Sequence, residues 1–181
     1  MPLTITIPER ELFDPSTNQF ISVKEQRLTL EHSLISISKW ESKWHKPYLS
    51  KEPKNEEETI DYLRCMCLNS SVDPKTFYAV DRNTIQTIAE YIGNPMTATT
   101  FKKEQKKPSR EIITNELIYF WMTNFGIPFD PCERWHLNRL MTLIEVASIK
   151  SQPGKKMSPK DILRQNTVLN AQRRAKMHSR G

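Results

Sequence analysis

Few side chains in this sequence have both the type and the spacing that chemistry requires. His136 and Asn138 closely follow a predicted helix start, where an imidazole and an amide can serve a catalytic or a metal site. The four histidines are scattered, however, and neither an H-x3-H nor an H-E-x-x-H pattern is present. We therefore interpret His136 as a satisfied or partly exposed histidine at a helix N-terminus.

The cysteines do not have the spacing of a metal or disulfide framework. Cys65 and Cys67 are separated by one residue, whereas a zinc knuckle needs at least two between its thiolates. Cys132 is far from both in the sequence. We expect three reduced thiols that pack among helices.

The acidic run Glu56–Glu58, followed by Asp61, has the composition of a cation site. Neighbouring carboxylates on a helix point in different directions, however, and the helix dipole favours acidic side chains in a first turn. We therefore expect a solvated helix start. Because no nucleophile-elbow, phosphate-loop or dinucleotide fingerprint occurs, we also expect no enzyme activity, no metal and no cofactor.

Charge is distributed unevenly along the 181 residues, whose formal net charge is +6. From Lys150 to the C-terminus there are nine Lys and Arg against one acid, Asp161, so the preceding body is slightly acidic. Such a tail attracts phosphates or acidic protein segments. No recognition-helix pattern or aromatic RNA-binding motif accompanies it, which makes nucleic-acid binding the weaker interpretation.

The N-terminal residues have the pattern of β-strands. Leu3, Ile5 and Ile7 alternate with polar residues, which is typical of a half-buried strand. After the turn-forming run 14–18, a second extended segment, Phe20–Leu30, changes phase, so we expect a break within it. Together they predict a hairpin or meander of two or three strands, which must pack on helices because an isolated hairpin is marginal in water.

Helical periodicity and helix breakers dominate the rest of the chain. A polar, basic stretch without period, 96–107, predicts a surface loop. After Gln152–Gly154, which we interpret as a hinge, a sparsely apolar and basic helix is expected to continue to about Met177. The helices predicted before the hinge are 31–46, 56–68, 83–91, 108–124 and 131–150.

The most informative segment is Glu116–Lys150, which carries six aromatic residues within two apolar helical patterns. The first helix is apolar on almost every face, which is typical of a central buried helix, and Ser109 is its expected N-cap. For the second helix, Asp130, Pro131 and Glu133 form a capping-box pattern that predicts a start at Pro131. The elbow between the two predicts an antiparallel helical hairpin.

Several strings of the sequence resemble a family of bacteriophage tail assembly chaperones. The most specific is ERWHLNRLMTLIEVASIK (133–150), in which the run Trp135–Arg139 precedes a Leu-rich helix. The likeness covers most of the chain. Its other strings are LTLEHSLISISKWESKWHKPYLS (28–50), NPMTATTF (94–101), ELIYFWMTNFGIPF (116–129) and KKMSPKDILRQNTVLNAQRRAK (155–176).

The resemblance implies a non-enzymatic protein that is made in the infected cell, acts in the host cytoplasm and is absent from the finished virion. Such chaperones coat the long, apolar tape-measure protein, keep it soluble, and give way as tail-tube subunits polymerise around it. The family often makes a longer form by programmed ribosomal frameshifting, which adds that form to the expected partners. The resemblance carries over no catalytic residue.

A protein that holds apolar helices needs adaptable apolar surface, which Trp and Met side chains supply. Trp40 and Trp44 lie on one helical stripe and are either core residues or a partner-facing patch. The basic tail is expected to grip acidic stretches of the client or to mediate self-association. The candidate partner-binding residues are Trp40, Trp44, Trp121, Met122, Trp135, Met141, Lys155, Lys156, Arg164, Arg173 and Arg174.

We therefore expect an α+β, mostly α fold, with a small N-terminal β-hairpin or meander (1–31) packed on a helical bundle (32–150). A hinged basic C-terminal helix (151–181) follows. The leading function is a tail assembly chaperone that binds the tape-measure protein. Two alternatives stay open: a nucleic-acid-binding accessory protein that uses the basic tail, and a minor structural component of the tail or baseplate. We expect no membrane partner, because no signal peptide and no apolar run of membrane length occur.

Overall fold

The computed structural model describes residues 2–14, 18–101 and 111–151, together with 163–164, 166–170 and 173. The chain divides into two compact units, Met1–Val146 and Ala147–Gly181. Every strand of the described residues belongs to the first unit, and the expected α+β, mostly α class is confirmed. The predicted hinge at 152–154 lies outside the described residues.

Four short strands form two antiparallel pairs, each a two-stranded sheet of its own. They are β1 (Leu3–Ile7), β2 (Arg10–Asp14), β3 (Gln19–Val23) and β4 (Gln26–Leu30). β1 pairs with β4 and β2 with β3, so the chain forms one long hairpin with a break in each arm. The break predicted in the second arm is confirmed, and a matching break in the first arm gives more strands than expected.

Six α-helices and one 3-10 helix follow the strands between Leu34 and Ser151, within the described residues. They are α1 (Leu34–Trp44), α2 (Glu56–Met66), the 3-10 helix η1 (Pro74–Ala79), α3 (Arg82–Gly93), α4 (Asn115–Asn124), α5 (Phe129–Cys132) and α6 (Leu137–Ser151). The helices predicted over 31–46, 56–68 and 83–91 are confirmed, with ends shifted by a few residues.

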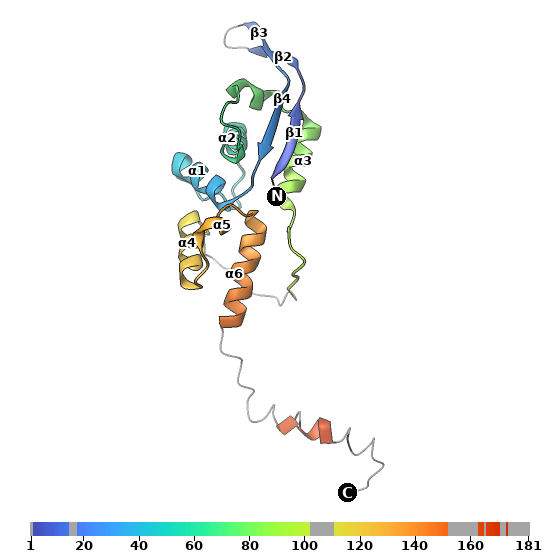
Figure 1. Cartoon of the computed structure of the whole chain (residues 1–181), viewed down its shortest axis with the longest axis vertical. Coiled ribbons are helices and arrows are strands. Elements are labelled where there is room, and N and C mark those ends of the chain that lie inside the picture. Colours follow the sequence, from blue (N-terminus) through green and yellow to red (C-terminus); the bar gives the residue numbers. More distant parts are fainter. Residues whose placement is uncertain are drawn as a thin grey trace. The chain divides into compact units, whose positions relative to one another are not determined.

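The paired strands β1 and β4 lie between α2 and α3 (Figure 1). Alternation along β1 is confirmed, because Ile5 and Ile7 are buried while Thr4 and Thr6 are exposed. Across the ladder, Ile5 faces the buried Leu28. One face of this small sheet therefore belongs to the core, and helices must cover it.

The segment that follows α2 completes the outer edge of β4. Leu68 N donates to Thr29 O at 2.9 Å, and Glu31 N donates to Met66 O at 2.8 Å. These bonds satisfy backbone groups that would otherwise form an open sheet edge. They also fix the C-terminal end of α2 against the strands.

Local capping explains the starts of three helices. The Ser33 hydroxyl accepts a hydrogen bond from the first turn of α1. In α2, Asn55 Oδ1 accepts from Glu58 N at 2.7 Å and Glu58 Oε2 accepts from Asn55 N at 2.9 Å, which is a capping box. In α3, Asp81 Oδ1 accepts from Thr84 N at 2.8 Å.

The start of α4 differs from the prediction. The helix begins at Asn115, and Ser109, its expected cap, lies outside the described residues. The burial of α4 also differs, because Ile118 and Met122 are fully buried whereas Phe120 is 62% exposed. α4 is therefore an amphipathic helix with one face in the core, and the expectation of a helix buried on every side is wrong.

The start of α6 also differs from the predicted start at Pro131. Asp130 has an extended backbone (ψ 129°) and caps no helix at Pro131, and α6 begins at Leu137. Leu137 N donates to His32 O at 2.9 Å, so the first turn of α6 is fixed by a residue from the segment after β4. The connection between α4 and α6 is consequently longer than the predicted elbow, and it contains α5.

One hydrophobic core runs through the first unit and joins the strands to the helices. Its largest fully buried side chain is Trp40. Both halves of the unit contribute to it, because residues from β1 to α6 pack in the same cluster. Further fully buried members are Ile7, Leu28, Leu30, Leu34, Ile37, Met66, Ile118, Met122, Leu137 and Leu140.

Candidate functional site

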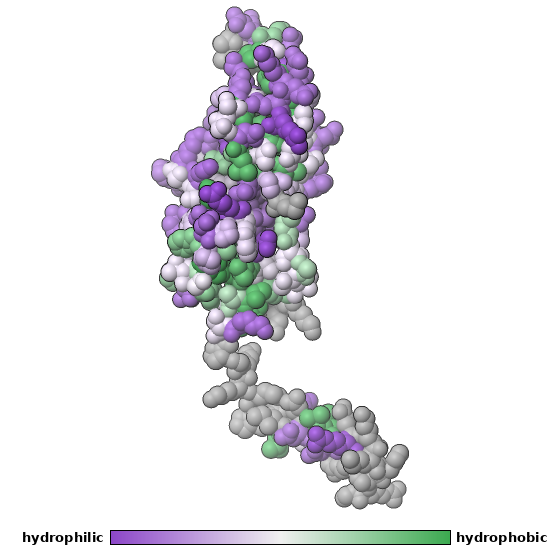
Figure 2. Space-filling model, viewed as in Figure 1, coloured by the Kyte–Doolittle hydropathy of each residue, from purple (hydrophilic) through white to green (hydrophobic). Residues whose placement is uncertain are grey.

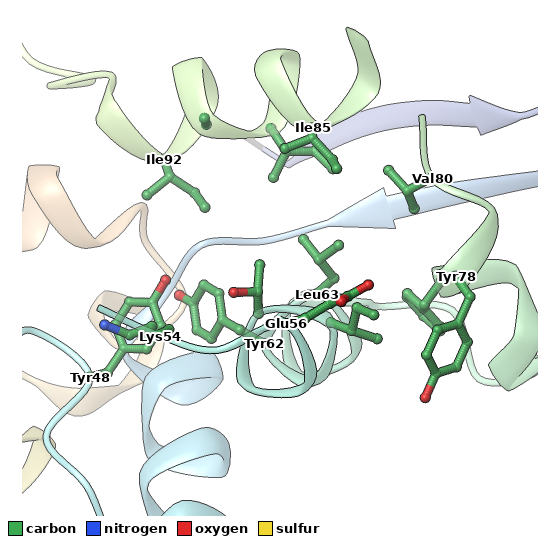
Figure 3. Close-up of a pocket in the computed structure, with 14 residues that line it drawn as sticks. Tyr48, Lys54, Glu56, Tyr62, Leu63, Tyr78, Val80, Ile85 and Ile92 are labelled. Carbon is green, nitrogen blue, oxygen red and sulfur yellow. The ribbon is translucent and has the colours of Figure 1, made fainter. Parts of the chain in front are cut away.

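An apolar groove of about 340 Å³ opens between α2 and α3. Ile85 and Ile92 of α3 face Tyr62 and Leu63 of α2 across it (Figure 3). Its volume falls at the lower end of the range for ligand-binding clefts, and its walls are mainly aliphatic and aromatic, as in such sites. Hereafter we call it the α2–α3 groove.

The sequence of α3 explains why this groove stays open. Ile85, Ile88 and Ile92 recur at spacings of three and four and therefore lie along one stripe. Ile88 is 3% exposed and anchors α3 in the core, whereas Ile85 is 51% exposed. In the same way, α2 buries Leu63 and leaves Ile60 only half-buried. Both helices thus present the outer edge of an apolar stripe to the groove.

A lysine lies at one end of the groove, beside Tyr48 (Figure 3). Lys54 Nζ is 4.6 Å from the centroid of the Tyr48 ring and 5.7 Å from that of Trp40. Partial burial lowers the pKa of Lys54, although Glu58 and Glu52 act in the opposite direction. No described carboxylate lies within salt-bridge distance of its ammonium group.

Tyr78 and Val80 lie toward the other end of the groove (Figure 3). The Arg64 guanidinium carbon is 5.3 Å from the centroid of the Tyr78 ring and 5.8 Å from that of Phe77. Arg64 Nε is buried and has no hydrogen-bond partner among the described residues. The rest of the guanidinium group has polar partners, because Nη2 donates to Pro74 O at 3.4 Å and Nη1 lies 3.9 Å from Asp61 Oδ1. The Tyr78 ring is 55% exposed and forms a wall of the groove.

A second exposed apolar surface lies on α4 and α5. Phe120 is 62% exposed and Phe129 is 47% exposed. Tyr119 contacts Phe129 edge to face, with ring centroids 5.1 Å apart, and its hydroxyl donates to Glu133 Oε2 at 3.0 Å. Figure 2 shows hydrophobic residues gathered over this part of the molecule.

The two tryptophans of α1 are fixed to α2. Trp40 is 1% exposed and its Nε1 donates to Glu58 O at 2.8 Å. Trp44 is half-buried and its Nε1 donates to Asp61 Oδ2 at 2.9 Å. The two indoles stack with centroids 6.2 Å apart. Trp40 is therefore a core residue, which corrects its place among the partner-binding candidates.

The remaining apolar candidates are either fully buried or half-buried. Met122 is fully buried in α4, which corrects its place among the partner-binding residues. Trp121, Trp135 and Met141 are half-buried and pack against the core. The structure therefore brings none of them into the α2–α3 groove.

The basic candidates belong to the second unit. Arg164 and Arg173 are exposed and lie on helical residues of the described C-terminal segment. Lys155, Lys156 and Arg174 lie outside the described residues.

The run Trp135–Arg139, the most specific part of the family resemblance, is a structural joint. His136 Nε2 donates to Tyr91 O at 2.9 Å, so its Nδ1 accepts from Asn138 N at 3.3 Å. Asn138 Nδ2 donates to Ile92 O at 2.9 Å and to Asn94 O at 2.8 Å. These contacts tie the start of α6 to the end of α3. His136 is 3% exposed, and the first interpretation of it as a satisfied histidine agrees with these bonds.

The acidic run is only partly solvated, in contrast to the expectation. Glu56 is exposed, whereas Glu58 and Asp61 are 3% and 5% exposed. Lys46 Nζ lies 2.5 Å from Glu58 Oε1, and Lys43 Nζ lies 2.5 Å from Asp61 Oδ1. The hydrogen bond from Lys46 holds the pKa of Glu58 below its usual value. These pairs bind α2 to the end of α1.

The three thiols are free and lie at buried or half-buried positions. Burial raises the pKa of Cys65 to about 11, so its reactive thiolate is scarce near neutral pH. Within the part of the chain that the structure describes, no three His, Cys, Asp or Glu side chains are grouped so as to hold a metal ion.

Comparisons of the chain with protein-family models, with curated proteins and with solved structures give no match. Among the described helices, none has both the length and the hydrophobicity that a bilayer crossing requires.

The spacing of the isoleucines in α3 is a sequence signal for one wall of the groove. Ile85, Ile88 and Ile92 were visible as a helical stripe, but such a stripe is usually fully covered by the core. Only the distance between α2 and α3 reveals that part of it remains uncovered. Trp40 and Trp44 are larger apolar residues than these isoleucines, yet their indole N–H groups hold them against α2.

Proposed function

We propose that this chain is a bacteriophage tail assembly chaperone that binds the tape-measure protein and keeps it soluble during tail assembly. The observation that carries the proposal is the α2–α3 groove, in which Ile85 is half-exposed at a position that a further helix would cover. The likeness of 28–50, 94–101, 116–129, 133–150 and 155–176 to tail assembly chaperones supplies the identity of the partner.

The geometry supports a holding role because an open apolar groove accepts one face of an amphipathic helix. A tape-measure protein is long and helical, so many copies of a small chaperone are needed to cover its apolar stripe. Each contact must be weak enough to be lost when tail-tube subunits polymerise. A groove of about 340 Å³ suits such a modest contact, since it holds only a few side chains. The exposed Phe120 and Phe129 provide further apolar surface.

On this proposal the protein acts in the host cytoplasm and does not remain in the virion. Its partners are the tape-measure protein, the tail-tube subunits that displace it, and a longer frameshifted form of the same chain. The exposed Arg164 and Arg173 belong to the segment that would meet acidic stretches of the client or another copy of the chain.

Co-expression with the tape-measure protein of the same phage tests the proposal. The soluble fraction of the tape-measure protein should rise, and the two proteins should co-purify. Unchanged solubility together with salt-sensitive retention on DNA would instead favour the nucleic-acid-binding alternative. Mass spectrometry of purified particles gives an independent test, because a chaperone is absent from them and a tail or baseplate component is present.

A further inference from the structure

The length of the α2–α3 groove matches two turns of a helix. Its α3 wall extends from Ile85 to Ile92, and seven residues of an α-helix span about 10 Å. The same length separates positions i and i+7 of a docked helix, with an i+3 or i+4 anchor between them. Side chains at these three positions lie on one face and fit a groove of this length.

Lys54 lines the groove and differs from two nearby lysines that do not line it. Lys43 and Lys46, the neighbouring lysines at the end of α1, are each paired with a buried carboxylate of α2. Lys54 is half-buried over Tyr48 and has no such pair among the described residues. A half-buried ammonium group gains more from an added carboxylate than an exposed one, because water screens the interaction less.

Glu56 also lines the groove, but it is exposed to solvent. Water and salt therefore screen the charge of Glu56 more than that of Lys54. Because Glu56 is itself negative, it weakly repels a carboxylate of the partner. Lys54 lies beside Tyr48 at one end of the groove, so a partner's carboxylate must stand at the end of its apolar stripe in order to reach it (Figure 3).

We propose that the α2–α3 groove binds an amphipathic helix of a partner through apolar side chains at i, i+3 or i+4, and i+7, and that Lys54 selects helices with a carboxylate at one end of this stripe. The inference rests on the proposed function in one respect only, namely that the docked helix belongs to the tape-measure protein. Lys54 thereby sets the orientation of the docked helix, which apolar contacts alone would not set. The carboxylate of the partner helix must lie at the end of the groove where Tyr48 is found.

The test uses the full-length protein and two synthetic helical peptides of about 18 residues, a length that allows partial helicity in water. Both carry Leu at i, i+4 and i+7, and they differ only in Glu or Gln one turn beyond the last Leu. Fluorescence anisotropy measures the dissociation constant of each peptide. The variants are Lys54→Met and Ile85→Lys. The matched control for the first is Lys39→Met, because Lys39 is an exposed lysine on α1 outside the groove. The matched control for the second is Ile112→Lys, because Ile112 is 64% exposed and also lies outside the groove.

The wild-type protein should bind the Glu peptide about fivefold more tightly than the Gln peptide, the size of a partly screened ion pair. Lys54→Met should remove this difference, and Ile85→Lys should weaken both peptides by about tenfold or more. Both control variants should behave as wild type, and Glu56→Gln should keep or increase the preference for Glu.

Retention of the Glu preference in Lys54→Met overturns the role of Lys54. A loss of binding in Ile112→Lys but not in Ile85→Lys overturns the groove as the site. The expected pattern without any effect on tape-measure solubility in co-expression supports the groove and contradicts the proposed function, so the two failures are distinguishable.

Discussion

Glu41 on α1 caps helix α4 through Asn115, a residue 74 positions away in the sequence. Glu41 Oε2 accepts hydrogen bonds from Asn115 N at 2.8 Å and from Asn115 Nδ2 at 2.6 Å. Glu41 Oε1 accepts from Tyr48 N at 2.7 Å. Thr114, which occupies the local N-cap position, makes no side-chain cap bond. The start of α4 is therefore determined by tertiary structure.

Replacement of Glu41 by Ala should lower the free energy of unfolding by about 2–4 kcal/mol. The reason is that Glu41 and Asn115 are 7% and 6% exposed, so the donors left behind have poor access to water. Urea unfolding, followed by circular dichroism, measures the change. The midpoint should fall while the slope stays the same, because the surface exposed on unfolding is nearly unchanged.

Ser42→Ala is the matched control for this substitution. Ser42 is exposed, and its hydroxyl donates to Lys39 O at 2.8 Å, one turn earlier in α1. Its loss should change the free energy of unfolding by less than about 0.5 kcal/mol. Equal stabilities of Glu41→Ala and Ser42→Ala would show that Glu41 does not cap α4.

Stability should fall as the pH drops below 6.5, because His32 is buried without its charge. His32 Nδ1 is hydrogen-bonded to Tyr62 Oη at 2.5 Å, and the centroid of its ring is 5.1 Å from that of His136. Burial, and secondarily the nearby His136, lower the pKa of His32 from 6.5 to about 3. The unfolded chain takes up a proton between these pH values and the folded protein does not, so the free energy of unfolding decreases by about 1.4 kcal/mol per pH unit.

Urea unfolding of the wild type and of His32→Asn between pH 7 and pH 5 tests this expectation. Asn has a polar atom near the position of His32 Nδ1 but does not titrate. We expect the variant to be less stable at pH 7 and to lose about 1 kcal/mol less per pH unit below pH 6. His136, whose pKa burial also lowers, accounts for a remaining slope. Identical slopes for the two proteins would contradict the assignment.

Elements whose ends are fixed by nearby residues were predictable from the sequence. The alternation of Ile5 and Ile7 predicted β1, and the acidic first turn at Glu56 predicted the start of α2. Spacings of three and four placed Ile85 and Ile88 on one face of α3. In each case the local pattern and the tertiary packing favour the same conformation, which is the condition under which such patterns are reliable.

Elements whose ends are fixed from a distance were mispredicted. The capping-box pattern at Asp130 and Glu133 indicated a helix there, yet α6 begins only where Leu137 N reaches His32 O. A local cap contributes about 1 kcal/mol, which the hydrogen bonds of His136 to Tyr91 O and of Leu137 N to His32 O outweigh together. The groove was missed for the same kind of reason, since the exposure of Ile85 depends on the separation of two helices and not on its own helix.

Asn138 allows a selective test of the contact between α3 and α6, because one side-chain amide donates two of its hydrogen bonds. Asn138 Nδ2 donates to Ile92 O and Asn94 O, so Asn138→Asp places a carboxylate oxygen against two carbonyl oxygens, whereas Asn138→Ala only removes the bonds. We expect a loss of about 1–2 kcal/mol for Ala and a larger loss for Asp. Asn83→Asp, the same substitution at an exposed position in the first turn of α3, should be neutral or slightly stabilising, because the helix dipole favours an acid there. Thermal unfolding of the three variants ranks them, and an Asn138→Asp protein as stable as Asn83→Asp would mean that the Trp135–Arg139 run does not hold the two helices together.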